Sequence, residues 1–384
     1  MQDCTQTLFN RKLIQSNIIN QEVTLIQKAN TAVICLSPYQ GGMELDSLTL
    51  SEMLSKVSDL TLIAQKDCFI SSEYKKRVNP TFTLHEIAFK KSLSPSIIFG
   101  VRQIIQDKEI KNVLFLGASE LKSLYFSFLG LEINLIIRHG TTKSSPKKDW
   151  FHRLIYSNVN YHISICKHLA RNVKTIIPFG PMTQERVIYP SLNITPSQEV
   201  DYSSKPHQPL QLLHVGRIAA GKGQKTAIEA CKILYENQID FEFNLVGGFH
   251  DPYKETFLNF IETLEYREKI NLVGHTKEVE RYYLQSDIFL FPSDGEGLSN
   301  AFIEAMIYGL STITYNNTSF PELQELGFSF ALVENQDREA LQTQLLERSQ
   351  HYSKEKTYSK KNALLSQKLF SYERELEEFQ ELLR

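Results

Sequence analysis

The chain has 384 residues, of which 42% are hydrophobic and 22% are charged, and its net charge at pH 7 is −2. This length is too great for one ordinary core, so two domains are expected. No run approaches the roughly 18 uninterrupted apolar residues of a membrane-spanning helix, and no secretion signal is visible, so we expect a cytoplasmic protein. Neither a zinc site nor a disulfide framework is supported by the scattered cysteines, which are Cys4, Cys35, Cys68, Cys166 and Cys231.

The first half of the chain predicts a parallel sheet. Residues 1–29 are polar and mixed, with only weak helical spacing of apolar residues. From Thr31 onward, apolar runs of strand length alternate with helical segments, and these runs are 32–36, 60–64, 112–116 and 133–137. Continuous apolar strands separated by helices are typical of a parallel sheet that is covered on both faces.

Three residues at the ends of these strands are candidates for ligand contact. Gly41 and Gly42 follow the first strand, and His139 follows the run that ends at Ile137. Ligands of open α/β sheets gather at the carboxyl ends of strands, and glycine lets a backbone come close to a ligand. An ordinary turn and a structural histidine are the alternatives. The first strand is not followed by G-x-G-x-x-G, which argues against a nicotinamide enzyme.

The second half repeats the alternation after a change in composition. Proline and serine gather between Pro190 and Pro209, which indicates a linker. Strand-like runs follow at 210–215, 241–246, 270–273, 288–291 and 311–314. The last helix has an apolar face made of Tyr372, Leu376, Phe379 and Leu383. We predict a first domain at 1–192, a linker at 193–209, a second domain at 210–365 and a terminal helix at 366–384.

The segment from Gly216 to Gly223 nearly matches a phosphate-binding P-loop. It follows a strand, as that motif requires, but Gly223 stands where the motif has the hydroxyl that holds Mg²⁺. Its two cations, Arg217 and Lys222, suit a different task, which is to neutralise a diphosphate leaving group without a metal. A tight turn with two solvated cations is the alternative.

Two acids, Glu296 and Glu304, bracket the predicted start of a helix. The apolar run 288–291 and a turn precede them, and the helix is expected to open between Gly297 and Asn300. The free amides of a helix N-terminus bind anions. Amides that take a diphosphate, beside acids that accept hydrogen bonds from hydroxyls, would suit a sugar nucleotide. A solvated loop acid and an ordinary helical glutamate are the alternatives.

Charge is distributed unevenly along the chain. Residues 1–195 contain 23 Lys and Arg against 15 Asp and Glu, a balance of +8, and the remainder has a balance of −10. Cations next to aromatic residues are typical of a membrane-surface or anionic-acceptor face, although a solvated loop would look the same. We see no nucleic-acid recognition motif. The clustered cations are Lys75, Lys76, Arg77, Lys90, Lys91, Lys143, Lys147 and Lys148.

Several of these segments together resemble glycosyltransferase family 4. The resembling segments are 37–44, 138–140, 187–190, 213–217, 221–223, 271–275, 282–287, 296–309 and 319–322. The chain departs from the family pattern in two places. Glycines are missing before Glu322, and Pro190-Ser191 stands where the family usually has Asn-Gly.

The resemblance implies a GT-B fold, in which two Rossmann-like domains face each other and a C-terminal helix crosses back to the first domain. It implies catalytic roles for Arg217 and Lys222 at the leaving diphosphate, for Glu296 at the donor-sugar hydroxyls and for His139 at the donor sugar. Glu304 would hold the ribose. The other substrate contacts that it implies are Gly41, Gly42, Gly216, Gly274, His275, Gly297, Leu298 and Ser299.

The resemblance further implies a retaining, metal-independent hexosyltransferase. The expected donor is a UDP-sugar, with a GDP-sugar as the alternative, and no cofactor is expected. The acceptor would be a glycan or a lipid-linked sugar in bacterial polysaccharide or lipopolysaccharide synthesis, and the basic first half would suit peripheral contact with the inner membrane face. Two alternatives remain, a sugar-nucleotide epimerase on the same fold and a non-catalytic scaffold or partner subunit.

Overall fold

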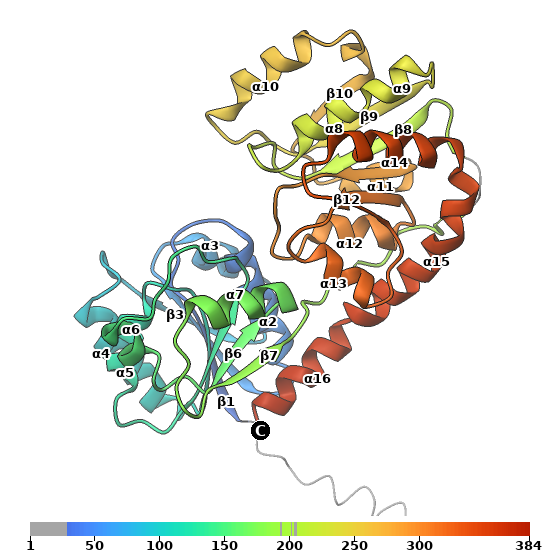
Figure 1. Ribbon diagram of the computed structural model, residues 1–384. Helices are drawn as coiled ribbons and strands as arrows, with labels where there is room; N and C mark the ends of the chain where they lie inside the picture. Colours follow the sequence, from blue (N-terminus) through green and yellow to red (C-terminus); the bar gives the residue numbers. More distant parts are fainter. Residues whose placement is uncertain (1–28, 193, 201, 203–205) are drawn as a thin grey trace, which may run out of the picture.

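The computed structural model describes residues 29–384 except 193, 201 and 203–205, and it describes no side chains for 353–357. The weak helical spacing expected near the N-terminus, and Cys4, lie outside these residues. Within them the chain forms two parallel sheets, each with helices on both faces (Figure 1). The first sheet ends at Val187 and the second begins at Leu210. The exact domain boundaries given above stay a prediction.

The first sheet has seven strands in the order β3-β2-β1-β4-β5-β6-β7. The four expected strands form, and three more join them at the two edges of the sheet. The added strands have polar residues among their apolar ones. β3 and β7 are edge strands, which are partly solvated and need no continuous apolar run. β6 lies between β5 and β7 and is largely buried, but it includes the polar residues His162 and Ser164. The strands are β1 (Asn30–Cys35), β2 (Asp59–Gln65), β3 (Thr83–Ile87), β4 (Asn112–Leu116), β5 (Asn134–His139), β6 (Tyr161–Ser164) and β7 (Gln184–Val187).

Two groups of helices cover the first sheet. Successive residues of β1 point to opposite faces, so Ile34 packs into one core and Val33 into the other. The Ile34 face is covered by α4 (Pro95–Asp107), α5 (Leu121–Phe128), α6 (Trp150–Ile155) and α7 (Lys167–Ile176). The Val33 face is covered by α2 (Gly42–Leu54), α3 (Phe69–Lys75) and the C-terminal helix α16 (Tyr372–Leu382).

The second sheet contains all five expected strands and one short addition, in the order β10-β9-β8-β11-β12-β13. Its strands are β8 (Leu210–Val215), β9 (Phe241–Val246), β10 (Ile270–Gly274), β11 (Ile288–Phe291), β12 (Ser311–Tyr315) and β13 (Ala331–Val333). Its helices are α8 (Gln224–Ala230), α9 (Lys232–Glu236), α10 (Tyr253–Glu262), α11 (Val279–Leu284), α12 (Asn300–Ile307), α13 (Phe320–Glu325), α14 (Arg338–Gln350) and α15 (Tyr352–Leu369).

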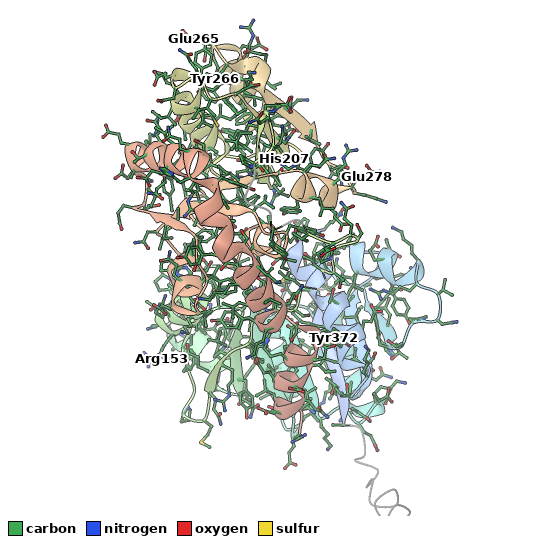
Figure 2. The ribbon with its side chains drawn as sticks, turned by 90° about the vertical axis from the view of Figure 1, so that its right-hand side faces the viewer. Arg153, His207, Glu265, Tyr266, Glu278 and Tyr372 are labelled. Carbon is green, nitrogen blue, oxygen red and sulfur yellow. The ribbon has the colours of Figure 1, made fainter. Side chains whose placement is uncertain are left out.

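The C-terminal helix crosses back to the first domain, as expected. After α15 the chain enters α16, which lies across the first domain with Tyr372 at its start (Figure 2). Phe379 and Leu383 are buried in the core of that domain, and Tyr372 and Leu376 pack against the same core. The side-chain amide of Asn112 donates to the carbonyl of Leu383 at 3.0 Å. The predicted apolar face of the helix is therefore confirmed.

A buried ion cluster fastens α16 in place. The Arg138 side chain, on β5, is 1% exposed, and it pairs with Asp46 of α2 at 2.7 Å and with Glu375 of α16 at 3.0 Å. The other Glu375 oxygen accepts a hydrogen bond from the backbone N–H of Ser191 at 2.6 Å. A buried guanidinium is tolerated only when it is paired in this way. Arg138 thus joins the first sheet, the terminal helix and the chain segment that leaves for the second domain.

Candidate functional site

The predicted Gly216 and Gly274 lie at strand ends of the second sheet, with Gly247, which was not predicted, at the end of the strand between them. Gly216, Gly247 and Gly274 stand at the carboxyl ends of β8, β9 and β10. The amide of Gly216 donates to Val246 and that of Gly247 to Gly274, each at 2.9 Å. A Cβ on Gly247 would lie 2.0 Å from the carbonyl oxygen of Gly216, so no larger residue fits. His275 follows Gly274 and is exposed to solvent.

The loop after β8 packs directly on the loop after β11. Gly223, at φ 84°, has no room for a side chain, because a Cβ there would lie 2.3 Å from the carbonyl oxygen of Pro292. The amide of Asp294 also donates to the carbonyl of Gly221 at 2.9 Å. The near-match to a P-loop is therefore a turn whose glycines permit contact with a second loop. This backbone contact brings Lys222 to Glu296.

Lys222 and Glu296 form an ion pair at the centre of the site. The Lys222 ammonium lies 2.8 Å and 2.9 Å from the two Glu296 carboxylate oxygens. The Ser293 hydroxyl also donates to Glu296, at 3.1 Å, and the Glu296 amide donates to the Thr318 hydroxyl at 3.1 Å. The side chains of Lys222 and Glu296 are 35% and 14% exposed, so a ligand can reach both.

Arg217 stands beside this pair with its charge unpaired. It is exposed, and no acidic side chain in the described part of the chain lies within ion-pair distance of it. Arg217 and Lys222 both line a cavity of about 470 Å³, whose opposite wall includes His250 and Tyr253. Two cations on one cavity wall, only one of them neutralised by an acid, can bind a polyvalent anion.

The helix after Glu296 begins at Asn300, within the expected range. Ser299 is its N-cap, and the Ser299 hydroxyl accepts from the amide of Phe302 at 3.3 Å. The backbone amides of Gly297 and Leu298 have no hydrogen-bond acceptor among the residues that the structure describes. These two amides therefore remain available to an anion. We call residues 296–299 the donor loop.

Glu304 lies about one turn into α12. Burial raises the pKa of its carboxyl, and a hydrogen bond with Tyr283 offsets part of that rise. The Tyr283 and Tyr308 rings stack beside it at 5.2 Å. Glu304 is thus half-buried next to aromatic rings, and the structure gives it no contact with Glu296. Its expected role at a ribose stays a prediction.

His139 is buried at the end of β5. It is 3% exposed, and its Nε2 lies 2.9 Å from Nδ1 of His162. Burial, with the His162 ring and nearby lysines, holds the pKa of His139 well below its usual value, so the ring is neutral at pH 7. Its Nδ1 has no hydrogen-bond partner in the described part of the chain. A role at the donor sugar stays a prediction.

The two glycines after β1 differ in their surroundings. Gly41 is the extended N-cap of α2, and a Cβ on it would lie 3.0 Å from a carboxylate oxygen of Glu44. A Cβ on Gly42 would meet no atom within 4 Å. Neither glycine contacts the donor loop, so their predicted role in substrate binding is untested.

Sequence reasoning missed residues that support the site from a distance. Thr318 holds the Glu296 backbone, and the Cys166 thiol, on α7 of the first domain, donates to the carbonyl of Gly297 at 3.0 Å. No local pattern marks either residue, because each contact joins segments that are distant in the sequence. Glu322 was noted only as part of a resembling segment.

The described part of the chain contains neither a metal-binding cluster nor a membrane-spanning helix. Across residues 29–384, leaving aside the few not described, no group of three His, Cys, Asp or Glu side chains is arranged to hold a metal ion. In the same part of the chain, no helix combines the length and apolar character needed to span a membrane.

Comparison with known proteins identifies the second half. Residues 198–363 match the family model "Glycosyl transferases group 1". The amylovoran biosynthesis glycosyltransferase AmsK of Erwinia amylovora is 36% identical over 152 residues, which is 38% of this chain and 37% of the relative. The chain therefore spans little more than a third of that relative's length.

The solved structures extend the likeness to both domains. A glycosyltransferase from Rickettsia africae matches 93% of this chain and 98% of its own at a TM-score of 0.76 and 16% identity. Anabaena Alr3699/HepE, in complex with UDP, matches 92% and 98% at a TM-score of 0.75 and 15% identity. The chain therefore has the GT-B fold, and its match to the Glycosyl transferases group 1 family covers residues 198–363.

Proposed function

We propose that this chain is a retaining hexosyltransferase of glycosyltransferase family 4, which takes its sugar from a nucleoside diphosphate donor. The observation that carries the proposal is the position of Lys222 and Glu296, which are paired beside the free amides of Gly297 and Leu298. In this arrangement a cation and two amides can bind a diphosphate, and a carboxylate can bind sugar hydroxyls. All of these groups lie where the loop after β8 packs on the loop after β11. The group 1 domain over residues 198–363 supports the same activity.

The chemistry requires the nucleoside diphosphate to leave as its negative charge grows. Arg217 and Lys222 would form charge-assisted hydrogen bonds to the phosphate oxygens, and the two donor-loop amides would add neutral ones. Lys222 is held by its pair with Glu296 and the two amides by the backbone, so these groups need little rearrangement as charge develops. No divalent metal is needed in this scheme, since the cations come from the protein.

The remaining residues would orient the sugar and the nucleoside. Glu296 would accept hydrogen bonds from the donor-sugar hydroxyls, and Glu304 from the ribose. His139, which is neutral, would act as a hydrogen-bonding group rather than as a cation. With retention, the acceptor hydroxyl attacks from the face that the leaving group departs, and a phosphate oxygen takes its proton.

We infer that the donor is a UDP-sugar, with a GDP-sugar as the second candidate. HepE, which has a similar fold, was crystallised with UDP. The proposed product is a bacterial cell-surface polysaccharide or lipopolysaccharide. This proposal is supported by the similarity of the second domain to AmsK, which is named for amylovoran biosynthesis. The proposed location is the cytoplasm, with peripheral contact at the inner membrane face.

The first experiment is a thermal-shift screen of nucleoside diphosphates. A ligand present at 100 times its Kd adds about 2.7 kcal/mol to the stability of the folded protein. UDP or GDP should raise the unfolding temperature, and adenosine diphosphate serves as the mismatched control. No shift with any nucleoside diphosphate would favour the non-catalytic scaffold.

The second experiment separates a transferase from an epimerase. A transferase should release nucleoside diphosphate from the donor sugar much faster once an acceptor glycan or lipid-linked sugar is added. Turnover of the donor sugar to its epimer, with no acceptor present, would favour the epimerase instead.

We further propose a different surface for the membrane contact. Lys75, Lys76 and Arg77 are each paired with an acid, namely Glu86, Glu73 and Glu52. By contrast, α4, α5 and α6 lie together on the outside of the first domain (Figure 1) and expose Phe99, Phe126, Trp150 and Leu154. Lys147, Lys148 and Arg153 flank Trp150 without an ion-paired acid in the described part of the chain. We propose that this α4–α6 face, rather than the paired cluster, contacts anionic lipid.

A further inference from the structure

Helix α7 of the first domain and its N-cap contact the second domain at Glu322, at Gly297 and through an exposed ion pair of 3.6 Å between Lys167 and Glu325. The first contact is with Glu322 of α13, whose side chain is buried. Its two carboxylate oxygens accept hydrogen bonds from the backbone amides of Lys167 and His168 at 2.8 Å and 3.0 Å. The Tyr189 hydroxyl donates to the same carboxylate. A buried carboxylate needs such partners, so Glu322 holds the start of α7 against the second domain.

The second contact reaches the donor loop itself. The Cys166 thiol, at the N-cap of α7, donates to the carbonyl of Gly297 at 3.0 Å. Burial raises the pKa of this thiol to about 12, so it keeps its proton at neutral pH and can donate. The backbones are also close here, because a Cβ on Gly297 would lie 3.0 Å from the carbonyl oxygen of Gly140. The donor loop therefore rests on the first domain.

The geometry of one peptide bond links this contact to ligand binding. In a trans peptide the carbonyl of one residue and the N–H of the next point in opposite directions. Because the Gly297 carbonyl is directed at Cys166 on α7, the Leu298 N–H must point away from α7. That N–H is one of the two amides without an acceptor in the described part of the chain. A thiol on one domain thus fixes the orientation of a free amide on the other.

The turn before α13 connects the two contacts on the second-domain side. Thr318 accepts the hydrogen bond from the Glu296 amide, and Glu322, four residues later, receives the amides at the start of α7. The segment from Thr318 to Glu322 therefore contacts the first residue of the donor loop. It also contacts the start of α7, where Cys166 contacts Gly297 in the same loop. Loosening either contact should affect the same amide.

We propose that α7 of the first domain positions the diphosphate-binding amide of Leu298, with Cys166 and Glu322 as positioning residues, so that binding of the donor diphosphate depends on the two domains being together. The inference rests on the proposed function, because it requires the donor loop to bind a diphosphate. It adds that α7 contributes to donor affinity without touching the donor.

The test compares the affinities of Cys166 variants for UDP and for uridine, measured by calorimetry for UDP and by ligand-observed NMR for uridine. Removing one hydrogen bond that orients the amide should weaken UDP binding by about three- to tenfold. Cys166→Ala should show this loss with uridine binding unchanged, because uridine carries no phosphate. Cys166→Ser restores a donor at the same position and should bring UDP binding back to within about twofold of wild type.

The matched control is Cys231→Ala. Cys231 is also fully buried and donates its thiol to a backbone carbonyl, that of Ala227 at 3.3 Å, but it lies in the core between α8 and α9. This variant should bind UDP and uridine as wild type does. If Cys166→Ala behaves in the same way, or if it loses UDP and uridine affinity equally, the inference is overturned while the proposed function stands. If the wild-type protein binds neither UDP nor GDP, the proposed function fails and the inference fails with it.

A second variant tests the shared route through α7. Glu322→Gln keeps the size of the side chain but replaces one acceptor with a donor that faces a backbone N–H. It should weaken UDP binding selectively, by at least as much as Cys166→Ala. Because both residues act through α7, the double variant should lose less UDP affinity than the product of the two single losses. Fully multiplicative losses would contradict a common route.

Discussion

The charged side chains at the strand ends are accessible in the second domain and buried in the first. In the second domain, Lys222 and Glu296 are paired but accessible, and Arg217 is exposed without an acid partner. In the first domain, Arg138 is fully buried between two acids, and the neighbouring His139 is buried and neutral. The charged groups at the strand ends of the second domain thus remain accessible to a ligand. In the first domain, the charge of Arg138 is buried and paired with the acids that hold α16 in place.

The largest effect that this comparison predicts is on stability. Arg138→Met should lower the free energy of unfolding by about 3–5 kcal/mol, because it leaves the buried Glu375 and the partly buried Asp46 without their cation. Urea unfolding measures the change, and Lys174→Met, which removes an exposed cation paired with Glu185, is the control and should change it little. An Arg138 variant as stable as wild type would show that the cluster does not fasten α16.

The second-domain cations should show the opposite behaviour. Lys222→Ala and Arg217→Ala should each lower kcat by roughly 30- to 1,000-fold, since each removes about 2–4 kcal/mol of stabilisation from the departing diphosphate. Unfolding should change little in comparison. Lys225→Ala, on the adjacent α8, removes an exposed lysine that pairs with Glu229 and is the matched control. Near-normal turnover in both site variants would refute the assignment.

Part of the fold and of the candidate site could be predicted from the sequence alone. The central strands could be predicted because they are buried on both faces and are apolar throughout. The edge strands β3 and β7 could not, since partial exposure breaks their apolar runs, and β6 could not because it is short and buries the polar His162 and Ser164. Lys222 and Glu296 were found separately, from motifs around each residue. Their contact depends on the fit of Gly223 against Pro292, which no local pattern encodes.

The first domain was harder to predict for a related reason. The sequence placed His139 at a strand end but could not tell that His162 and neighbouring helices would bury it. Cys166 carried no signal at all, because its partner Gly297 lies 131 residues away. Interdomain contacts of this kind are set by how two finished domains meet, and neither segment shows it alone.

Within the second domain, Glu304 and Glu296 should contact different parts of the ligand. Glu304→Gln should weaken binding of the nucleoside diphosphate itself, because the ribose belongs to every form of the ligand. Glu296→Gln should chiefly weaken binding of the intact donor sugar. Loss of one charge-assisted hydrogen bond corresponds to about 1.5–3 kcal/mol, or roughly 10- to 150-fold in Kd. Calorimetry with UDP and with a UDP-sugar measures both, and equal losses for both ligands in both variants would disprove the division.

The smallest expected effect concerns the membrane. Each cation near an anionic surface contributes about 1 kcal/mol, so a variant with Trp150→Ala, Lys147→Gln, Lys148→Gln and Arg153→Gln should lose flotation with anionic liposomes. The matched control neutralises Lys75, Lys76 and Arg77, which are already paired with acids, and should float as wild type does. Binding should weaken with salt, because screening acts over about 8 Å at physiological ionic strength. Flotation that is indifferent to lipid charge would favour a soluble acceptor.

The central claim is that the second domain binds a nucleoside diphosphate with its own cations and amides. Calorimetric titration of UDP or GDP in the presence of a chelator tests it most directly, with wild type and Lys222→Ala compared in the same buffer. The account predicts that wild-type affinity is unchanged by the chelator and that Lys222→Ala binds at least tenfold more weakly. Binding that disappears with the chelator and returns with Mg²⁺ or Mn²⁺ would contradict it.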